Sequence, residues 1–246
     1  MRSTNNLQLA VCTKSNRWQV CEEILMNLAM IPARMGSQRL KQKNLRELDG
    51  APLITRAIRK CKAAGVFDEI WVNSEHPAFG EIAASEGVKF HARPADLANH
   101  AATSEQFIYE FLRTHPCERV FQVHSIAPLL TASEVTAFVR AMIDGDYDTM
   151  LSCTHEQIEC AYRNQPVNFT FAEKTNSQEL DPIQRITWSI TGWRAATYLD
   201  AAAAGKTATY SGKIGFYAVD RMAGHIIKTE DDLQIAAALL PLREGC

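Results

Sequence analysis

A dense cluster of positive charge occupies one short stretch of this sequence. The thirteen residues from Arg34 to Arg46 contain five basic side chains and no acidic one. Within them Gly36 permits close backbone approach, and Ser37 offers both a hydroxyl and an amide. Cations and backbone amides gathered in one loop can bind phosphate oxygens. We therefore predict a polyanion site in this loop, in preference to the plainer interpretation of a solvated basic loop.

The charge of the whole chain is nearly balanced, so this cluster is a local feature. The 246 residues carry 26 basic and 28 acidic side chains, which gives a formal net charge of -2. With 46% hydrophobic and 22% charged residues, the composition is that of an ordinary globular protein. A basic excess normally supplies affinity for nucleic acid or anionic membranes, and no apolar run approaches the ~20 residues that span a bilayer. We expect no nucleic-acid partner and no membrane segment.

Alternating strand and helix patterns surround the basic loop. An apolar strand at residues 27–31 precedes it, and helices and short apolar strands then alternate as far as residue 153. We predict helices at 52–64, 77–85, 103–115, 132–143 and 231–240, and further strands at 69–72, 88–91, 119–123, 149–153 and 213–219. Repeated βαβ units indicate an α/β domain with a mostly parallel sheet and helices on both faces. The basic loop then lies at the carboxyl end of the first strand, where such sheets bind ligands.

Two parts of the chain do not follow this alternation. Residues 1–26 are polar and uneven, and we treat them as an N-terminal extension outside the predicted domain at 27–246. Between about residues 155 and 200 the pattern loosens, apart from a half-exposed strand predicted at 167–171. This irregular lobe could serve as a dimer arm.

Several common catalytic signatures are missing or incomplete. Gly205, Lys206 and Thr207 look like the end of a Walker A loop, but Asp200 stands where its first glycine belongs. No G-x-G-x-x-G follows a predicted strand, and no G-x-S-x-G elbow occurs. The seven cysteines are odd in number and include no C-x-x-C. This usage favours reduced thiols in a cytoplasm over a disulfide framework.

The basic loop is part of a longer motif that resembles a known family. Residues 31–45 read I-P-A-R-M-G-S-Q-R-L-K-Q-K-N-L, and residues 93–98 read R-P-A-D-L-A, with Ala102 and Ser104 beyond them. Together with residues 50–54 and the pair Phe121 and Gln122, these segments resemble the CMP-sialic acid synthetases, or acylneuraminate cytidylyltransferases. That family includes the pseudaminic and legionaminic acid enzymes and, more distantly, the CMP-KDO synthetases. The resemblance extends in pieces from about residue 27 to residue 240.

The resemblance implies a fold and a reaction. The fold would be a three-layer Rossmann-like sheet of the nucleotide-diphospho-sugar transferase type. CTP and an acid sugar would give a CMP-sugar and pyrophosphate, with Mg²⁺ as cofactor and a homodimer as the assembly. Arg34 and Lys43 would be catalytic, because they would stabilise charge on the α-phosphate and the leaving group. The residues expected to bind the nucleotide are Ala33, Arg34, Gly36, Ser37, Arg39, Lys43, Asn44, Arg93, Ala102 and Ser104.

Fewer residues are assigned to the sugar. The resemblance places Gln122 against it. In the irregular lobe, Gln178 and Arg185 could bind the sugar carboxylate, since a guanidinium matches carboxylate geometry. They could equally be polar residues of a dimer interface. The family arginine that follows the glutamine falls on Leu130 in this chain.

The chain departs from the family at its usual metal site. The family segment D-I-D-T-x-x-D-L corresponds to residues 226–233, so its two metal-binding aspartates fall on Ile226 and Lys228. The later acid, Asp232, is kept, either as a metal ligand or as a cap of the final helix. Magnesium could be held by the triphosphate with Asp232 or with the nearby Asp220 or Asp231, and Lys228 could supply positive charge beside the phosphates. The alternatives to this cytidylyltransferase are a relative that binds nucleotide without catalysis and another sugar nucleotidyltransferase, such as a CMP-KDO synthetase.

Overall fold

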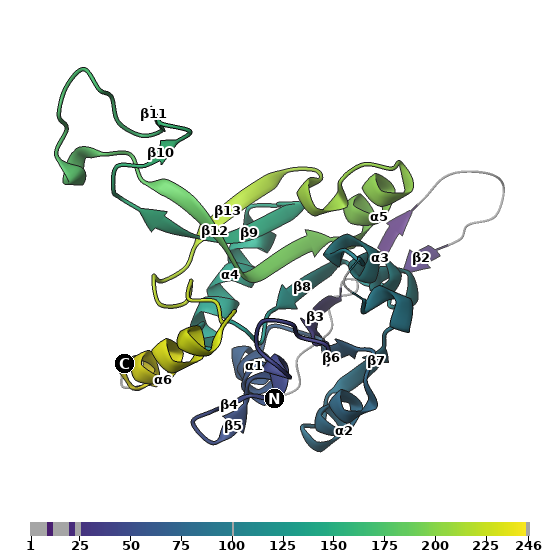
Figure 1. Ribbon diagram of the computed structural model, residues 1–246. Helices are drawn as coiled ribbons and strands as arrows, with labels where there is room; N and C mark the ends of the chain where they lie inside the picture. Colours follow the sequence, from purple (N-terminus) through teal and green to yellow (C-terminus); the bar gives the residue numbers. More distant parts are fainter. Residues whose placement is uncertain (1–8, 12–19, 23–25, 100, 245–246) are drawn as a thin grey trace, which may run out of the picture.

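The computed structural model describes residues 9–11, 20–22, 26–99 and 101–244, which build a single large sheet flanked by helices (Figure 1). The sheet has seven strands in the order β13-β9-β12-β8-β3-β6-β7. All neighbouring strands are parallel except at β12, which runs antiparallel to both β8 and β9. The predicted α/β class and the mostly parallel sheet are confirmed. The strands are β3 (Asn27–Pro32), β6 (Glu69–Ser74), β7 (Lys89–Ala92), β8 (Arg119–Val123), β9 (Thr149–Glu156), β12 (Ile183–Arg194) and β13 (Ile214–Ala218).

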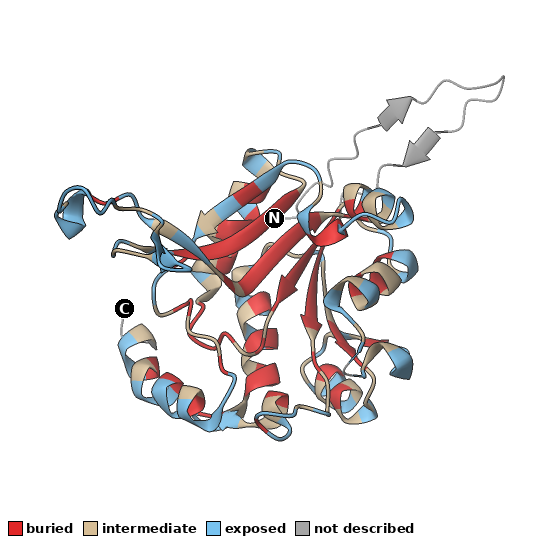
Figure 2. Ribbon diagram, turned by 45° about the horizontal axis from the view of Figure 1, so that its top comes forward, coloured by how far each residue is buried: buried red, intermediate tan, exposed pale blue. Residues whose placement is uncertain are grey.

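Helices cover both faces of the sheet because its central strands are apolar on both sides. In β3, Ala29 and Ile31 pack into one core cluster, and Leu28 and Met30 pack into another, as the alternation of side chains along a strand requires. The first cluster is closed by α1 (Leu53–Ala64), α2 (Pro77–Ser85) and α4 (Ala132–Asp144), and the second by α3 (Ser104–Thr114) and α5 (Ala195–Ala203). Figure 2 shows the buried strands between these helical layers.

Several elements begin where their sequence signals place them. The side chain of Thr103 caps α3 and exchanges hydrogen bonds with Gln106, and Thr131 forms the same capping box with Glu134 at α4. The final helix α6 (Glu230–Glu244) packs against a third apolar cluster that contains Leu48 of β4 (Glu47–Leu48). The neighbouring strand β5 (Ala51–Pro52) pairs with β4. No helix within the described residues combines the length and the apolar character needed to cross a bilayer.

The prediction of an irregular stretch from residue 155 to residue 200 is wrong at both ends. Strand β9 continues to Glu156, and residues 183–203 form β12 and α5. In the sheet, β12 lies between β9 and β8. Polar side chains hid β12 in the sequence, because Thr187, Ser189 and Thr191 are buried. The hydroxyl of Ser189 donates to the Ala223 carbonyl at 2.7 Å and lies 3.1 Å from the hydroxyl of Thr187, so both side chains are paired within the core.

The part that remains outside the sheet is an arm at residues 157–182. It contains a small hairpin of β10 (Ala161–Tyr162) and β11 (Gln165–Pro166), and it projects from the body of the molecule (Figure 1). The strand predicted at 167–171 is absent from this arm, and Phe171 there is exposed. In the stretch 1–26, the structure describes the pair β1 (Leu9–Val11) and β2 (Val20–Glu22) and Met26, and the remainder of that predicted extension lies outside the described residues.

Candidate functional site

A pocket of about 270 Å³ opens at the carboxyl ends of β3 and β8. This is the place predicted for a ligand, because loops at that edge of a parallel sheet converge on one point. Of the residues expected to bind nucleotide or sugar, nine line this pocket: Ala33, Arg34, Ser37, Lys43, Asn44, Arg93, Ala102, Ser104 and Gln122. Gly36 and Arg39 belong to the same loop but do not line the pocket.

The pKa of Lys43 is shifted by several charged side chains around it. Burial first, and then the charges of Arg39 and Arg34, lower the pKa of its ammonium group to about 8. Lys228 lowers this pKa further, whereas Asp232 raises it. Lys228 therefore lies close enough to act on the basic loop from 185 residues further along the chain. Three cations and one carboxylate therefore act on Lys43, so the net charge around it is positive, as a polyanion site needs.

Asn44 holds the basic loop in shape. The short 3-10 helix Lys43–Leu45 places this side chain inward, where it is buried. Its amide nitrogen donates to the Arg34 carbonyl at 3.1 Å, and its oxygen accepts from the Ser125 hydroxyl at 2.7 Å. The loop is also held by a hydrogen bond from the backbone N–H of Met35 to the Glu75 carboxylate at 2.9 Å. Asn44 thus positions the loop, and its predicted contact with the nucleoside stays a prediction.

Arg93 braces the ends of two strands beneath the pocket. Its guanidinium is only 5% exposed and donates to the side chain of Asn73 at 2.6 Å, to the Asn73 carbonyl at 2.6 Å and to the Ala33 carbonyl at 3.3 Å. The same group lies over the ring of Phe107 at 4.4 Å. Burial lowers the pKa of Arg93 to about 10, so it stays charged at neutral pH. Two of its nitrogens are occupied, and Nη1 donates to none of the described residues.

Eight of the residues that line the pocket were not among the sequence-predicted site residues, and Phe107, His124 and Ser125 are three of them. Phe107 lies one turn along α3 from Ser104, and this helical spacing was the available signal for it. Ser125 and His124 follow β8. Burial, with a smaller effect of Lys43, lowers the pKa of His124 to about 4, so its imidazole is neutral at pH 7. A group with that pKa is a weak general base at neutral pH and serves better as a hydrogen-bond partner.

The described residues do not offer a carboxylate site for a metal at residues 226–232. Asp232 Oδ2 accepts from the N–H groups of Lys228 and Thr229 at 2.8 Å each and from the Thr229 hydroxyl at 2.9 Å, as a cap of α6. Asp220 pairs with Arg243. No group of three His, Cys, Asp or Glu side chains is gathered anywhere in the described part of the chain. The capping interpretation of Asp232 therefore has direct support, and its metal-binding role does not.

Gln178 and Arg185 do not join the pocket. Gln178 belongs to the arm, where its carbonyl accepts from Gln157, and Arg185 on β12 forms an ion pair with Glu156 at 2.9 Å. Neither side chain lines the pocket of the same chain. The sugar-binding role suggested for them stays a prediction.

Comparison with known proteins assigns the chain to a family. A family model described as "Cytidylyltransferase" matches residues 28–236. This chain is a member of the cytidylyltransferase family. The matched range takes in every strand of the seven-stranded sheet except the first residue of β3, together with the whole lining of the pocket.

The curated relatives of this cytidylyltransferase family member act on acid sugars, by their names. It is 30% identical over 125 residues to N-acylneuraminate cytidylyltransferase A of Danio rerio, and the matched segment covers 50% of this chain and 29% of the relative. It is 34% identical over 112 residues to pseudaminic acid cytidylyltransferase of Campylobacter jejuni subsp. jejuni serotype O:23/36 (strain 81-176). That matched segment covers 43% of this chain and 48% of the relative. The matches thus span less than half the length of each relative.

Solved structures confirm the Rossmann-like fold at low sequence identity. A CMP:2-keto-3-deoxy-manno-octonic acid synthetase complexed with CTP superposes with a TM-score of 0.67 at 16% identity, over 88% of this chain and 99% of the other. A 4-diphosphocytidyl-2C-methyl-D-erythritol synthase from Anaerococcus prevotii DSM 20548 superposes with a TM-score of 0.62 at 12% identity, with the same coverage. At such identities the likeness concerns the fold alone.

Proposed function

We propose that this protein transfers a cytidylyl group from CTP to the hydroxyl of an acid sugar of the nonulosonic type and releases pyrophosphate. The observation that carries the proposal is the convergence of nine sequence-predicted residues on one pocket at the carboxyl edge of the sheet, in a chain of the cytidylyltransferase family. The names of the sialic and pseudaminic acid relatives support the substrate class.

The pocket suggests how the groups would divide the work. Arg34, Ser37 and Lys43 line the cationic side, where they would hold the triphosphate and stabilise the charge that passes to the leaving pyrophosphate. Arg93 Nη1 would face the nucleoside. Gln122, 2% exposed at the end of β8, would contact the sugar. Attack by the sugar hydroxyl forms a bond to the α-phosphorus and breaks the bond to the bridging oxygen, which leaves with the pyrophosphate, while the hydroxyl proton is released to water.

Pyrophosphate release is the direct test of this function. Purified protein is incubated with CTP, Mg²⁺ and separately with sialic, legionaminic, pseudaminic and KDO acids, and pyrophosphate is measured with a coupled assay. We expect one of the acids to give turnover with CTP and much less with UTP or GTP. Turnover with KDO alone would favour a CMP-KDO synthetase. Absence of pyrophosphate with every acid would refute the proposal.

Lys228 distinguishes this chain from relatives that carry the metal-binding aspartate. If its ammonium supplies charge beside the triphosphate, Lys228→Met should raise the KM for CTP about tenfold, a loss of ~1.4 kcal/mol. The matched control is Lys206→Met, an exposed lysine that does not line the pocket. An unchanged KM in the Lys228 variant would show that this lysine is not used. The requirement for Mg²⁺ stays a prediction, tested by adding a chelator to the same assay.

The low pKa of Lys43 sets an upper pH limit on activity. A lysine with a pKa of about 8 loses its charge as the pH rises through that value, whereas an ordinary lysine stays charged to about pH 10. The kcat/KM for CTP, which reports groups of the free enzyme, should therefore fall about tenfold per pH unit above about pH 8. Lys43→Arg should move this fall to higher pH. A flat profile to pH 10 in the unmodified protein would contradict the assignment.

A binding-only relative is the second candidate, and the replacement of both metal-site aspartates by Ile226 and Lys228 favours it. It predicts that CTP binds by calorimetry but that no acid sugar gives turnover, and that Lys228→Asp costs no activity. The homodimer and a cytoplasmic location also stay predictions. For the first, the exposed Tyr162, Val167 and Phe171 of the arm are candidate contacts, and light scattering of the purified protein measures the mass.

A further inference from the structure

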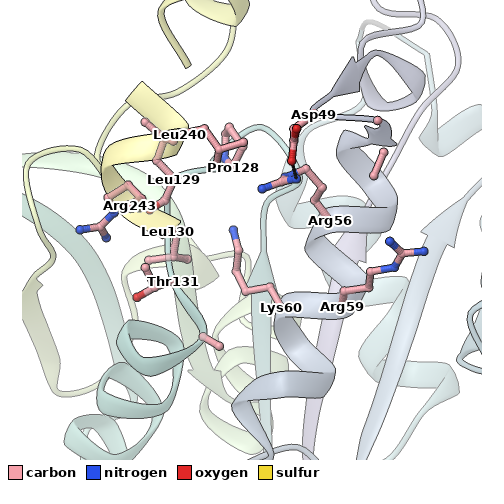
Figure 3. A pocket seen from close by; sticks show the side chains of 13 residues that line it. Asp49, Arg56, Arg59, Lys60, Pro128, Leu129, Leu130, Thr131, Leu240 and Arg243 are labelled. Carbon is pink, nitrogen blue, oxygen red and sulfur yellow. Dashed lines mark hydrogen bonds and ion pairs between the residues drawn. The ribbon is translucent and has the colours of Figure 1, made fainter. Parts of the chain in front are cut away.

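The structure contains a second pocket, shown in Figure 3, which is distinct from the pocket proposed for the nucleotide. Its volume is about 440 Å³, and its walls come from α1, the turn between β4 and β5, the loop that joins β8 to α4, and α6. The two pockets share no lining residue. The loop serves both, because residues 124–126 line the first pocket and residues 128–131 line the second.

The charge of this second pocket is positive, and its cations differ in how they are paired. Arg59 forms an ion pair with Glu86, and Arg243 forms ion pairs with Glu134 and Asp220. In Figure 3 both of these arginines point away from the centre of the pocket. Their charges are thus largely neutralised outside it.

Lys60 and Arg56 extend from α1 toward the loop, into the pocket itself (Figure 3). Arg56 lies 3.8 Å from Asp49, an acid whose side chain is 68% exposed. Lys60 Nζ donates to the Ala127 carbonyl at 2.7 Å, and among the described residues no carboxylate forms an ion pair with it. Burial lowers the pKa of Lys60 to about 8. An anion beside this ammonium would remove part of the cost of burying an unpaired charge.

The remaining lining of the pocket is largely apolar and comes from Pro128, Leu129, Leu130 and Leu240. A volume of this size matches sites for small organic molecules, which combine apolar walls with a few polar groups that fix orientation. A bare inorganic ion would fill only a small part of a pocket of this volume. Lys60 and the leucines together specify a charged head and an apolar body.

We propose that this pocket binds a small organic anion, with a carboxylate or phosphate group against Lys60 and an apolar portion against the leucines. The bound group would sit next to the ammonium that already holds the Ala127 carbonyl. It would therefore contact the loop whose other half lines the nucleotide pocket. This site is independent of the proposed reaction, and its occupancy can be measured without turnover.

Acylation of lysines tests the site in the unmodified protein. The protein is treated with an amine-selective acylating reagent, and peptide mapping reads the rates at Lys43, Lys60 and Lys62 in the same digest. Benzoate carries a carboxylate on an apolar ring, phenyl phosphate carries a phosphate on the same ring, and benzyl alcohol is the uncharged control. We expect benzoate or phenyl phosphate to slow acylation of Lys60 at least threefold in a saturable way and to leave Lys62 unchanged.

The two anions distinguish the two head groups, since either can be the better protector. Calorimetry with the better probe should then show at least tenfold weaker binding to Lys60→Met, with Lys62→Met, on the same helix, as the matched control. An unchanged Lys60 rate at ~100 mM of both anions, or equal protection by benzyl alcohol, would overturn the proposal. The Lys43 rate reports the nucleotide pocket separately, so failure of one site does not imply failure of the other.

Discussion

Replacement of Lys43 by methionine is expected to lower kcat by ~10²–10³, a loss of about 3–4 kcal/mol of transition-state stabilisation. The physical reason is the position of its ammonium on the pocket wall, where it would meet the charge that develops on the departing pyrophosphate. Methionine keeps the length of the side chain but supplies no charge. The measurement is steady-state pyrophosphate release at saturating CTP and acid sugar.

The same variant separates catalysis from folding. Because burial lowers the pKa of Lys43, the folded protein disfavours its charged form, and removal of that charge should leave the free energy of unfolding unchanged or raise it. Lys41→Met is the control, since Lys41 is exposed in the same loop and does not line the pocket. Its turnover should stay within twofold of the unmodified protein. Near-normal turnover in Lys43→Met would remove Lys43 from the proposed mechanism.

Replacement of Arg93 by methionine is expected to lower the free energy of unfolding by ~3 kcal/mol. The substitution leaves the side-chain oxygen of Asn73 without its donor, and it removes one of the two donors of the Asn73 carbonyl, which also accepts from the Ala33 N–H at 3.0 Å. A buried unpaired acceptor is costly. CTP affinity should fall by more than tenfold, because the ends of β3 and β6 lose their common brace. Urea unfolding and calorimetry measure the two effects.

Two further variants give the Arg93 result its meaning. Arg93→Lys keeps the charge but not the planar fork, so it should recover only part of the lost stability. Arg113→Met on α3 is the matched control, because Arg113 also lies over an aromatic ring but is exposed. It should change the stability by no more than ~0.5 kcal/mol. Equal losses in Arg93→Met and Arg113→Met would contradict the bracing role.

Local patterns made most of the fold predictable, and long-range contacts account for what was missed. Helix α2 matches its predicted bounds, because residues 77–85 begin with proline and end before a glycine. Strand β12 was missed because it contains buried polar residues, and the partner of Thr187 is Ser152, 35 residues away in the sequence. Hydrophobic periodicity in the sequence does not distinguish buried polar residues from exposed ones.

In the candidate site, too, local sequence features could be predicted and long-range contacts could not. Its cationic loop is continuous in the sequence, so the pocket position and most of its lining could be predicted. The role of Asn44 in positioning the basic loop could not be predicted, because its partner Ser125 lies 81 residues away in the sequence. The proximity of Lys228 to Lys43 likewise depends on how α6 and the segment before it pack, which no local signal specifies.

The reversed strand β12 has a consequence for the order in which the molecule can form. It is hydrogen-bonded to β8 on one side and to β9 on the other, so β9 and β13 reach the rest of the sheet only through it. During synthesis, residues 26–182 would emerge with one long edge of β8 uncovered, although all of its residues are buried in the final fold. An unpaired apolar edge is a template for aggregation. A chain truncated before Ile183 should therefore aggregate, whereas the full chain closes this edge once β12 has been made.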